Sequence, residues 1–246
     1  MTTVRIAMWS GPCNISTAMM RAWENRPDTV VVDEPFYAFY LDRTGADHPG
    51  RAEVIASQPI DWRQAVADLM APLPAGRTVQ YQKHMTHHLL AEVGREWLDE
   101  VAHAFLIRDP VEVLASYAQR RPDAAVSAED VGIPQQLALF EQVMDRTGRI
   151  PPVLDSADVL RQPQRILTLL CAAVGVPFSE RMLSWPPGPG STDGVWAPHW
   201  YAAVEQSTGF VPYRPSGRRL PDALMPAAEV CAEPYRKLRA YCLGNG

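Results

Sequence analysis

The chain has 246 residues, a formal net charge of -5 and 47% hydrophobic residues. That length suits a single α/β domain with a substantial buried core. The acidic balance argues against general nucleic-acid binding, which needs a basic face to neutralise phosphates, so no nucleic-acid partner is expected.

Short apolar runs alternate along the chain with longer stretches of helical pattern. The predicted strands are Val4–Trp9, Thr29–Asp33, Thr78–Gln82, Ala102–Ile107 and Pro152–Leu154. The predicted helices are Ser16–Asn25, His87–Glu100, Pro110–Arg120 and Pro163–Val174. This alternation predicts an α/β fold with a central parallel sheet flanked by helices. Ligands of such sheets bind beyond the carboxyl ends of the strands, so the residues at those ends are the candidate site.

The C-terminal quarter begins with WPPGPGSTDG, residues 185–194, whose Pro and Gly content predicts a loop. We expect one domain over residues 1–246, with residues 185–246 forming a region of loop and helix. No apolar run approaches the length of a bilayer span. The four cysteines match no metal-binding spacing and no signal peptide is evident, so a cytoplasmic location is expected.

The turn after the first strand, Ser10–Thr17, carries the sequence SGPCNIST. It lacks the Gly-Lys-Ser/Thr of a Walker loop. A helix that begins near Asn14 would still direct free N–H groups and its positive dipole end at an anion, with the Ser16 and Thr17 hydroxyls as further donors. The alternative is an ordinary helix N-cap by Asn or Ser.

The fourth strand ends in FLIRDPVEVLASY, where Arg108 follows the strand and Ser116 lies about two turns into the next helix. A guanidinium at a strand end and a hydroxyl on the following helix can flank one phosphate. The alternative is a surface ion pair between Arg108 and Asp109 or Glu112.

With these two motifs in order, the chain resembles the PAPS-dependent sulfotransferases, in particular a bacterial sulfotransferase-like branch. Residues 153–178 and 193–210 also resemble segments of that branch. The resemblance implies a P-loop-like three-layer fold. It further implies 3′-phosphoadenosine 5′-phosphosulfate (PAPS) as sulfuryl donor, PAP as product, no metal, and residues 185–246 closing over the cofactor. The cofactor residues that it implies are Gly11, Pro12, Cys13, Asn14, Ile15, Ser16, Thr17, Arg108, Ser116, Gly194 and Trp196.

Cys13 departs from the family pattern, because relatives usually place Lys or Arg there to stabilise the leaving phosphate. A cysteine supplies no positive charge, and it is either a small packing residue or a reactive thiol. Lys83 or Arg21 could replace the missing cation. If neither does, the chain is instead a non-catalytic or weakly active PAPS- or nucleotide-binding protein.

The candidate base is Glu34, because DEPFYAFY resembles the segment that carries the catalytic glutamate in heparan O-sulfotransferases and trehalose sulfotransferase. The alternative role for Glu34 is to cap the turn before Pro35. QKHMTHH offers Lys83, His84 and His87 as further catalytic candidates, by analogy with the Lys-x-His of cytosolic sulfotransferases. The spacing differs by one residue, and His84 should point away from Lys83 in an extended segment.

The acceptor is expected to be a small molecule with a hydroxyl group, in a cleft that aromatic side chains could line. Aromatic residues are more often part of a core, but the candidates for this role are Phe36, Tyr37, Phe39, Tyr40, Trp62, Trp196, Trp200 and Tyr201. A nucleotide-dependent kinase is a second alternative, but the Walker lysine and a magnesium-binding acidic pair are not evident. The oligomeric state is left open, with a homodimer among the options.

Overall fold

The computed structural model describes residues 3–120, 126–215, 217 and 219–244. In this part of the chain, five parallel strands form one sheet in the order β2-β3-β1-β4-β5. The strands are β1 (Val4–Ser10), β2 (Thr29–Asp33), β3 (Val79–Met85), β4 (Ala102–Ile107) and β5 (Val153–Asp155). The predicted α/β class and central parallel sheet are confirmed.

β3 extends three residues beyond the predicted strand end, to Met85, and remains paired with β1 over its whole length. Lys83 and His84 therefore lie within the strand rather than after it. Because successive side chains of a strand point to opposite faces, these two residues face opposite sides of the sheet. Lys83 consequently lines the cavity described below, whereas His84 packs against Trp9 on the opposite face.

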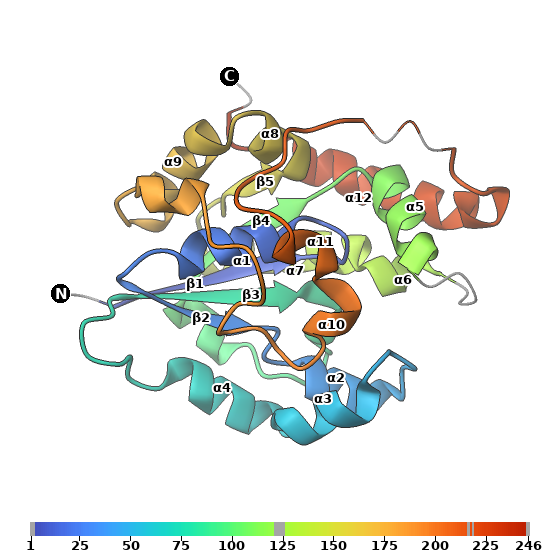
Figure 1. Ribbon diagram of the computed structural model, residues 1–246. Helices are drawn as coiled ribbons and strands as arrows, with labels where there is room; N and C mark the ends of the chain where they lie inside the picture. Colours follow the sequence, from blue (N-terminus) through green and yellow to red (C-terminus); the bar gives the residue numbers. More distant parts are fainter. Residues whose placement is uncertain (1–2, 121–125, 216, 218, 245–246) are drawn as a thin grey trace.

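Helices cover both faces of the sheet, as Figure 1 shows. On one face, Ile6 and Met8 pack in a core with buried residues of α1 (Ser16–Glu24) and α9 (Pro163–Val174). On the other, Ala7 and Trp9 pack in a core with α4 (Trp62–Met70), α7 (Ile133–Thr147) and α12 (Met225–Arg239). Successive side chains of β1 thus pack into two cores on opposite faces of the sheet, so the fold has three layers.

The remaining helices are short or lie at the edges of the layers. They are α2 (Tyr37–Thr44), α3 (Arg51–Ser57), α5 (Pro110–Arg120), α6 (Ala128–Val131), α8 (Ser156–Arg161), α10 (Ala197–Trp200) and α11 (Ala202–Glu205). Among the described residues, 3₁₀ turns cover Thr86–His88, Glu96–Glu100, Glu180–Leu183 and Asp222–Leu224. α10 and α11 lie on the side toward which the strand arrows point (Figure 1). None of the described helices is both long and apolar enough to cross a membrane.

The predicted helix His87–Glu100 is wrong, because this segment forms two 3₁₀ turns joined by an irregular stretch. Arg95 replaces the missing helical hydrogen bonds, since its guanidinium donates to the carbonyls of Leu90, at 3.2 Å, and Val93. Gly94 makes the close approach possible, because a Cβ there would lie 2.9 Å from the Trp62 ring. Tertiary packing has therefore overridden the helical pattern.

We predict that Arg95→Met destabilises the fold by about 1–3 kcal/mol, because it leaves partly buried carbonyl groups without a donor. Chemical denaturation measures the loss. Arg149→Met is the matched control, since Arg149 is exposed, and it should change stability by less than about 0.5 kcal/mol. Equal effects of the two changes would contradict the role given to Arg95.

Candidate functional site

A cavity of about 290 Å³ opens where the carboxyl ends of β1 to β4 meet. The turn after β1 lines it, together with Glu34 from the end of β2, Lys83 from β3 and Arg108 after β4. α5 contributes Ser116, Tyr117 and Arg120, and residues of the segment 200–211 complete the wall. A cavity therefore lies at the carboxyl edge of the sheet, where the sequence predicted the site.

The turn between β1 and α1 has an unusual backbone, because Cys13 and Ile15 have positive φ angles of 55° and 44°. Ile15 stands at the N-cap position of α1, where no side chain accepts a hydrogen bond from the helix. The first N–H groups of α1 therefore remain available, in a concave turn of the kind that binds anions. Asn14 does not cap the helix, because its Oδ1 accepts no hydrogen bond from the described residues, while its Nδ2 donates to the Leu106 carbonyl at 2.5 Å.

Gly11 does not line the cavity but allows the turn to pack closely. A Cβ at this position would lie 2.4 Å from the Val131 carbonyl oxygen at the end of α6. A larger residue would therefore push the turn away from α6 and shift Pro12–Thr17, all of which line the cavity.

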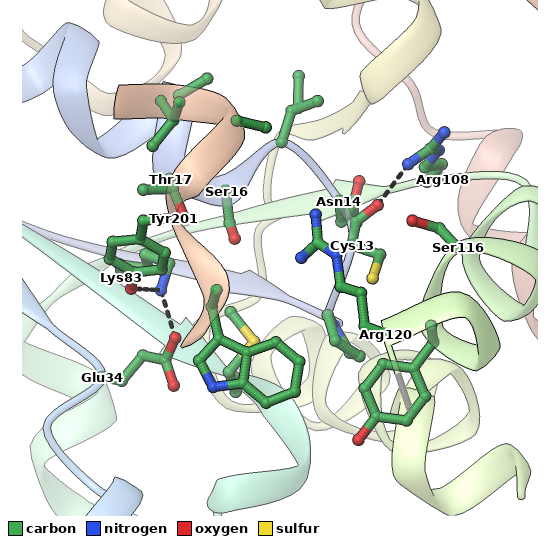
Figure 2. A pocket seen from close by; sticks show the side chains of 18 of the residues that line it. Cys13, Asn14, Ser16, Thr17, Glu34, Lys83, Arg108, Ser116, Arg120 and Tyr201 are labelled. Atoms are coloured by element: carbon green, nitrogen blue, oxygen red, sulfur yellow. Dashed lines mark hydrogen bonds and ion pairs between the residues drawn. The ribbon is translucent and has the colours of Figure 1, made fainter. Parts of the chain in front are cut away.

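Arg108 and Ser116 lie near each other on one side of the cavity (Figure 2). The Arg108 guanidinium donates through Nη1 to the Cys13 carbonyl at 2.6 Å and through Nε to Glu112 Oε2 at 3.0 Å. Both hydrogen bonds fix the guanidinium beside the turn. The expected pair from β4 and α5 is thus brought together with the expected anion-binding turn.

Glu34 and Lys83 form the opposite side of the cavity. The buried Lys83 ammonium donates to Glu34 Oε1, to Asp33 Oδ1 at 2.9 Å and to the Tyr201 hydroxyl at 2.8 Å. An ammonium group has three N–H donors, so all of them are used. Glu34 has a positive φ of 43°, which turns the chain sharply at the end of β2.

This charge cluster shifts the pKa values of its members. Burial raises the pKa of Glu34, and the Asp33 carboxylate adds to the effect, although Lys83 opposes it. Burial alone would lower the pKa of Lys83, but the Asp33 and Glu34 carboxylates outweigh it and raise that pKa. Lys83 therefore stays charged. The carboxylate of Glu34 binds a proton more readily than an ordinary carboxylate does, because its pKa is raised.

Histidines occupy the wall next to Glu34. His88 stacks on the rings of Tyr37 and Tyr40 at centroid distances of 4.7 and 4.6 Å. Its Nδ1 lies 3.8 Å from Glu34 Oε2, too far for a hydrogen bond. Burial lowers the pKa of His87 to about 3 and the pKa of His88 well below its usual range. The imidazoles of His87 and His88 are therefore neutral.

Besides Gly11, three predicted site residues are not among those that line the cavity: His84, Gly194 and Trp196. His84 stacks on Trp9 at 4.3 Å in the core behind the sheet, where burial lowers its pKa to about 3. Gly194 donates its N–H to Asp33 Oδ2 at 3.3 Å, and Trp196 donates its indole N–H to the Tyr201 hydroxyl at 3.0 Å. Gly194 and Trp196 thus support the charge cluster from outside.

Sequence reasoning counted Tyr201 only among the aromatic residues that could line a cleft, and it assigned no site role to Arg120. Tyr201 lies 118 positions after Lys83, and no local pattern connects the two residues. Arg120 did leave a signal, because it follows Ser116 by four residues and therefore shares its face of α5. Arg21, which was a candidate replacement cation, is not in the cavity lining and pairs with Asp193 at 2.5 Å.

The chain matches a known protein family. A family model described as a sulfotransferase domain matches residues 4–237. Branched-chain-amino-acid aminotransferase-like protein 2 from Arabidopsis thaliana is 30% identical over 236 residues, which are 96% of this chain and 41% of that protein. Branched-chain-amino-acid aminotransferase-like protein 1 from the same organism is 34% identical over 205 residues, which are 83% of this chain and 36% of that protein. The chain thus spans only about two fifths of the length of these relatives.

Solved structures share the fold. The sulfotransferase domain of the Synechococcus PCC 7002 olefin synthase matches with a TM-score of 0.58 and 16% identity, over 94% of this chain and 95% of that one. A sulfotransferase from Alicyclobacillus acidocaldarius matches with a TM-score of 0.56 and 16% identity, over 95% and 94%. The P-loop-like architecture expected from the sequence is therefore confirmed.

We predict that Lys83→Met destabilises the fold by about 3–5 kcal/mol, because it leaves two buried carboxylates without their cation. Lys237→Met is the control, since Lys237 is the other lysine of the sequence and its ion pair with Glu233 is exposed. The control should cost less than about 1 kcal/mol. A small loss of unfolding free energy on Lys83→Met, measured by chemical denaturation, would show that the cluster is not held by charge.

Proposed function

Because this chain belongs to the sulfotransferase domain family, we propose that it transfers the sulfuryl group of PAPS to a hydroxyl group of a small-molecule acceptor. One observation carries the proposal. A single cavity joins an anion-binding turn and the Arg108–Ser116 pair on one side to the buried Glu34 on the other. That arrangement suits a donor with two phosphate positions and an acceptor that must lose a proton.

The donor side fits PAPS in the number and type of its groups. The uncapped start of α1 and the Ser16 and Thr17 hydroxyls would hold the 5′-phosphosulfate. Arg108 and Ser116 would hold the 3′-phosphate that distinguishes PAPS from other adenine nucleotides. When bound, PAPS supplies an activated sulfuryl group on a good leaving phosphate.

The acceptor side would use Glu34 as the base. Sulfuryl transfer forms a bond between the acceptor oxygen and sulfur and breaks the bond from sulfur to the bridging phosphate oxygen, which keeps the electron pair. The acceptor proton passes to the Glu34 carboxylate, whose raised pKa suits it to accept a proton. Lys83 and Tyr201 would hold the carboxyl groups in place.

The acceptor itself would lie among the aromatic and imidazole rings beside Glu34. Tyr37, His48, His87, His88 and Trp200 line this part of the cavity. The neutral imidazoles of His87 and His88 and the aromatic rings favour an uncharged molecule over an anion or cation, because a charged group would be desolvated there without a partner. A small, uncharged alcohol or phenol fits these properties.

A non-catalytic PAPS- or nucleotide-binding protein is the second candidate, and Cys13 is the observation that favours it. Cys13, which offers no positive charge, stands in the turn that would receive the leaving phosphate. Binding experiments cannot separate the two candidates, whereas turnover of radiolabelled PAPS can. Transfer of label to any alcohol in a panel supports the enzyme, and tight PAPS binding with no transfer supports the binding protein.

We predict that Arg108→Ala weakens binding of adenosine 3′,5′-bisphosphate by about 2–3 kcal/mol, because a charged hydrogen-bonded contact to the 3′-phosphate is lost. The affinity for AMP, which lacks this phosphate, should change little. Isothermal titration calorimetry compares the two ligands. Equal losses would mean that Arg108 acts by holding the Cys13 carbonyl rather than by binding a phosphate.

We predict that Glu34→Gln lowers the rate of transfer to an aliphatic alcohol by about a hundredfold or more, while PAPS binding is retained. The parent rate should fall as the pH drops through the raised pKa of Glu34, because the protonated carboxyl cannot accept a proton. The variant should lose this acid limb. His87→Asn is the control, and a greater loss from it than from Glu34→Gln would assign the base to the histidine.

A further inference from the structure

Three side chains with a permanent positive charge line the described part of the cavity: Lys83, Arg108 and Arg120. Charge on a leaving phosphate oxygen needs a nearby cation with free N–H donors. The turn itself supplies none, because a cysteine carries no positive charge. One of these three residues must meet that need if the cavity performs the proposed transfer.

Lys83 is unsuited to the task, since its three donors are all bound to Asp33, Glu34 and Tyr201. The two carboxylates also outnumber its single charge. Breaking either contact would leave a buried carboxylate without its cation, at high cost. Lys83 therefore serves the carboxylates of the cluster.

Arg108 is partly committed as well. Its Nε and Nη1 bind Glu112 and the Cys13 carbonyl, which leaves Nη2 as its unbound nitrogen. Figure 2 places this residue beside Ser116, at the edge of the cavity away from Glu34. Its position suits the 3′-phosphate, which lies at the far end of the donor from the transferred group.

Arg120 is different, because no described residue forms a hydrogen bond or ion pair with its guanidinium. It ends α5, one helical turn after Ser116, and long helical side chains point back toward the helix N-terminus. Figure 2 shows this side chain crossing the cavity toward Cys13, with the guanidinium between the Ser116 side and the Glu34 side. That is the space into which the Ser16 hydroxyl also faces.

We infer that Arg120 is a catalytic residue that supplies the cation missing at Cys13. Its guanidinium donates to the 5′-phosphosulfate and stabilises the electron pair left on the bridging oxygen when the sulfur–oxygen bond breaks. The positive charge of the site thus comes from the end of α5 instead of the turn after β1. This inference rests on the proposed function, but the placement of Arg120 can be tested without an acceptor.

The first test compares two monophosphates by calorimetry. Arg120→Met should weaken binding of adenosine 5′-phosphate about tenfold or more and leave adenosine 3′-phosphate within about threefold. Arg108→Ala should give the reverse pattern. Arg149→Met, an exposed arginine away from the cavity, controls for the loss of one charge. Thermal melting verifies that each variant is folded, which the exposure of Arg120 favours.

The second test is the rate of sulfuryl transfer from radiolabelled PAPS to water or an alcohol. Arg120→Met should lower it about a hundredfold. Adding Cys13→Arg to Arg120→Met should recover about tenfold or more, whereas Cys13→Ser in the same background should recover nothing. Such recovery would support a shared cation role for the two positions.

The outcomes are distinct. Loss of adenosine 3′-phosphate binding alone on Arg120→Met would assign Arg120 to the other phosphate and overturn the inference. Unchanged binding of both nucleotides would also overturn it. Selective loss of adenosine 5′-phosphate binding in a chain that transfers no sulfuryl group would support the phosphate contact of Arg120, contradict the proposed function and remove the catalytic role. An unaltered chain that binds neither nucleotide would contradict both.

Discussion

The ammonium group of Lys83, buried between the carboxylates of Asp33 and Glu34, is the interaction on which the cavity depends. It joins the ends of the adjacent strands β2 and β3 and fixes the carboxylate proposed as the base. Tyr201 accepts from Lys83 and from Trp196 and donates to Asp33, so the C-terminal segment closes on the same cluster. The strand ends, the base and the far wall of the cavity are therefore held by one buried network.

The two sides of the cavity differ in their electrostatics. Backbone N–H groups, Arg108 and Arg120 gather around the turn after β1, where an anion would be stabilised. Buried histidines with lowered pKa values and aromatic rings gather around Glu34. This separation matches a reaction in which the donor is highly charged, the acceptor is neutral and a proton leaves on the acceptor side.

Much of the fold could be predicted from the sequence, because β1, β2 and β4 are short, apolar and followed by polar turns. The segment His87–Glu100 could not, since its shape depends on Arg95 binding carbonyls and on Gly94 packing against Trp62. Such tertiary contacts leave no periodic signal. The alternation rule did predict that His84 points away from Lys83, and the ring lies on Trp9.

The candidate site could be predicted where a residue directly follows a strand, as for Glu34, Arg108 and the turn at Cys13. It could not be predicted where a contact joins residues far apart in the chain, as for the hydrogen bonds of Tyr201 with Lys83 and Asp33. Arg120 is an intermediate case, because its spacing from Ser116 was visible but the direction of its side chain was not. Helical spacing gives the face of a residue, and only the packed structure shows which cavity that face borders.

On the proposed function, the cavity binds an adenine nucleotide with both 5′ and 3′ acidic groups. Calorimetry of the unaltered protein tests this binding most directly, with a chelator added so that no divalent metal ion is available. Adenosine 3′,5′-bisphosphate should bind without metal and about tenfold or more tightly than AMP, because Arg108 and Ser116 add a charged contact. Tighter binding of ATP that requires Mg²⁺, with no preference for the 3′-phosphate, would contradict the claim and favour a kinase.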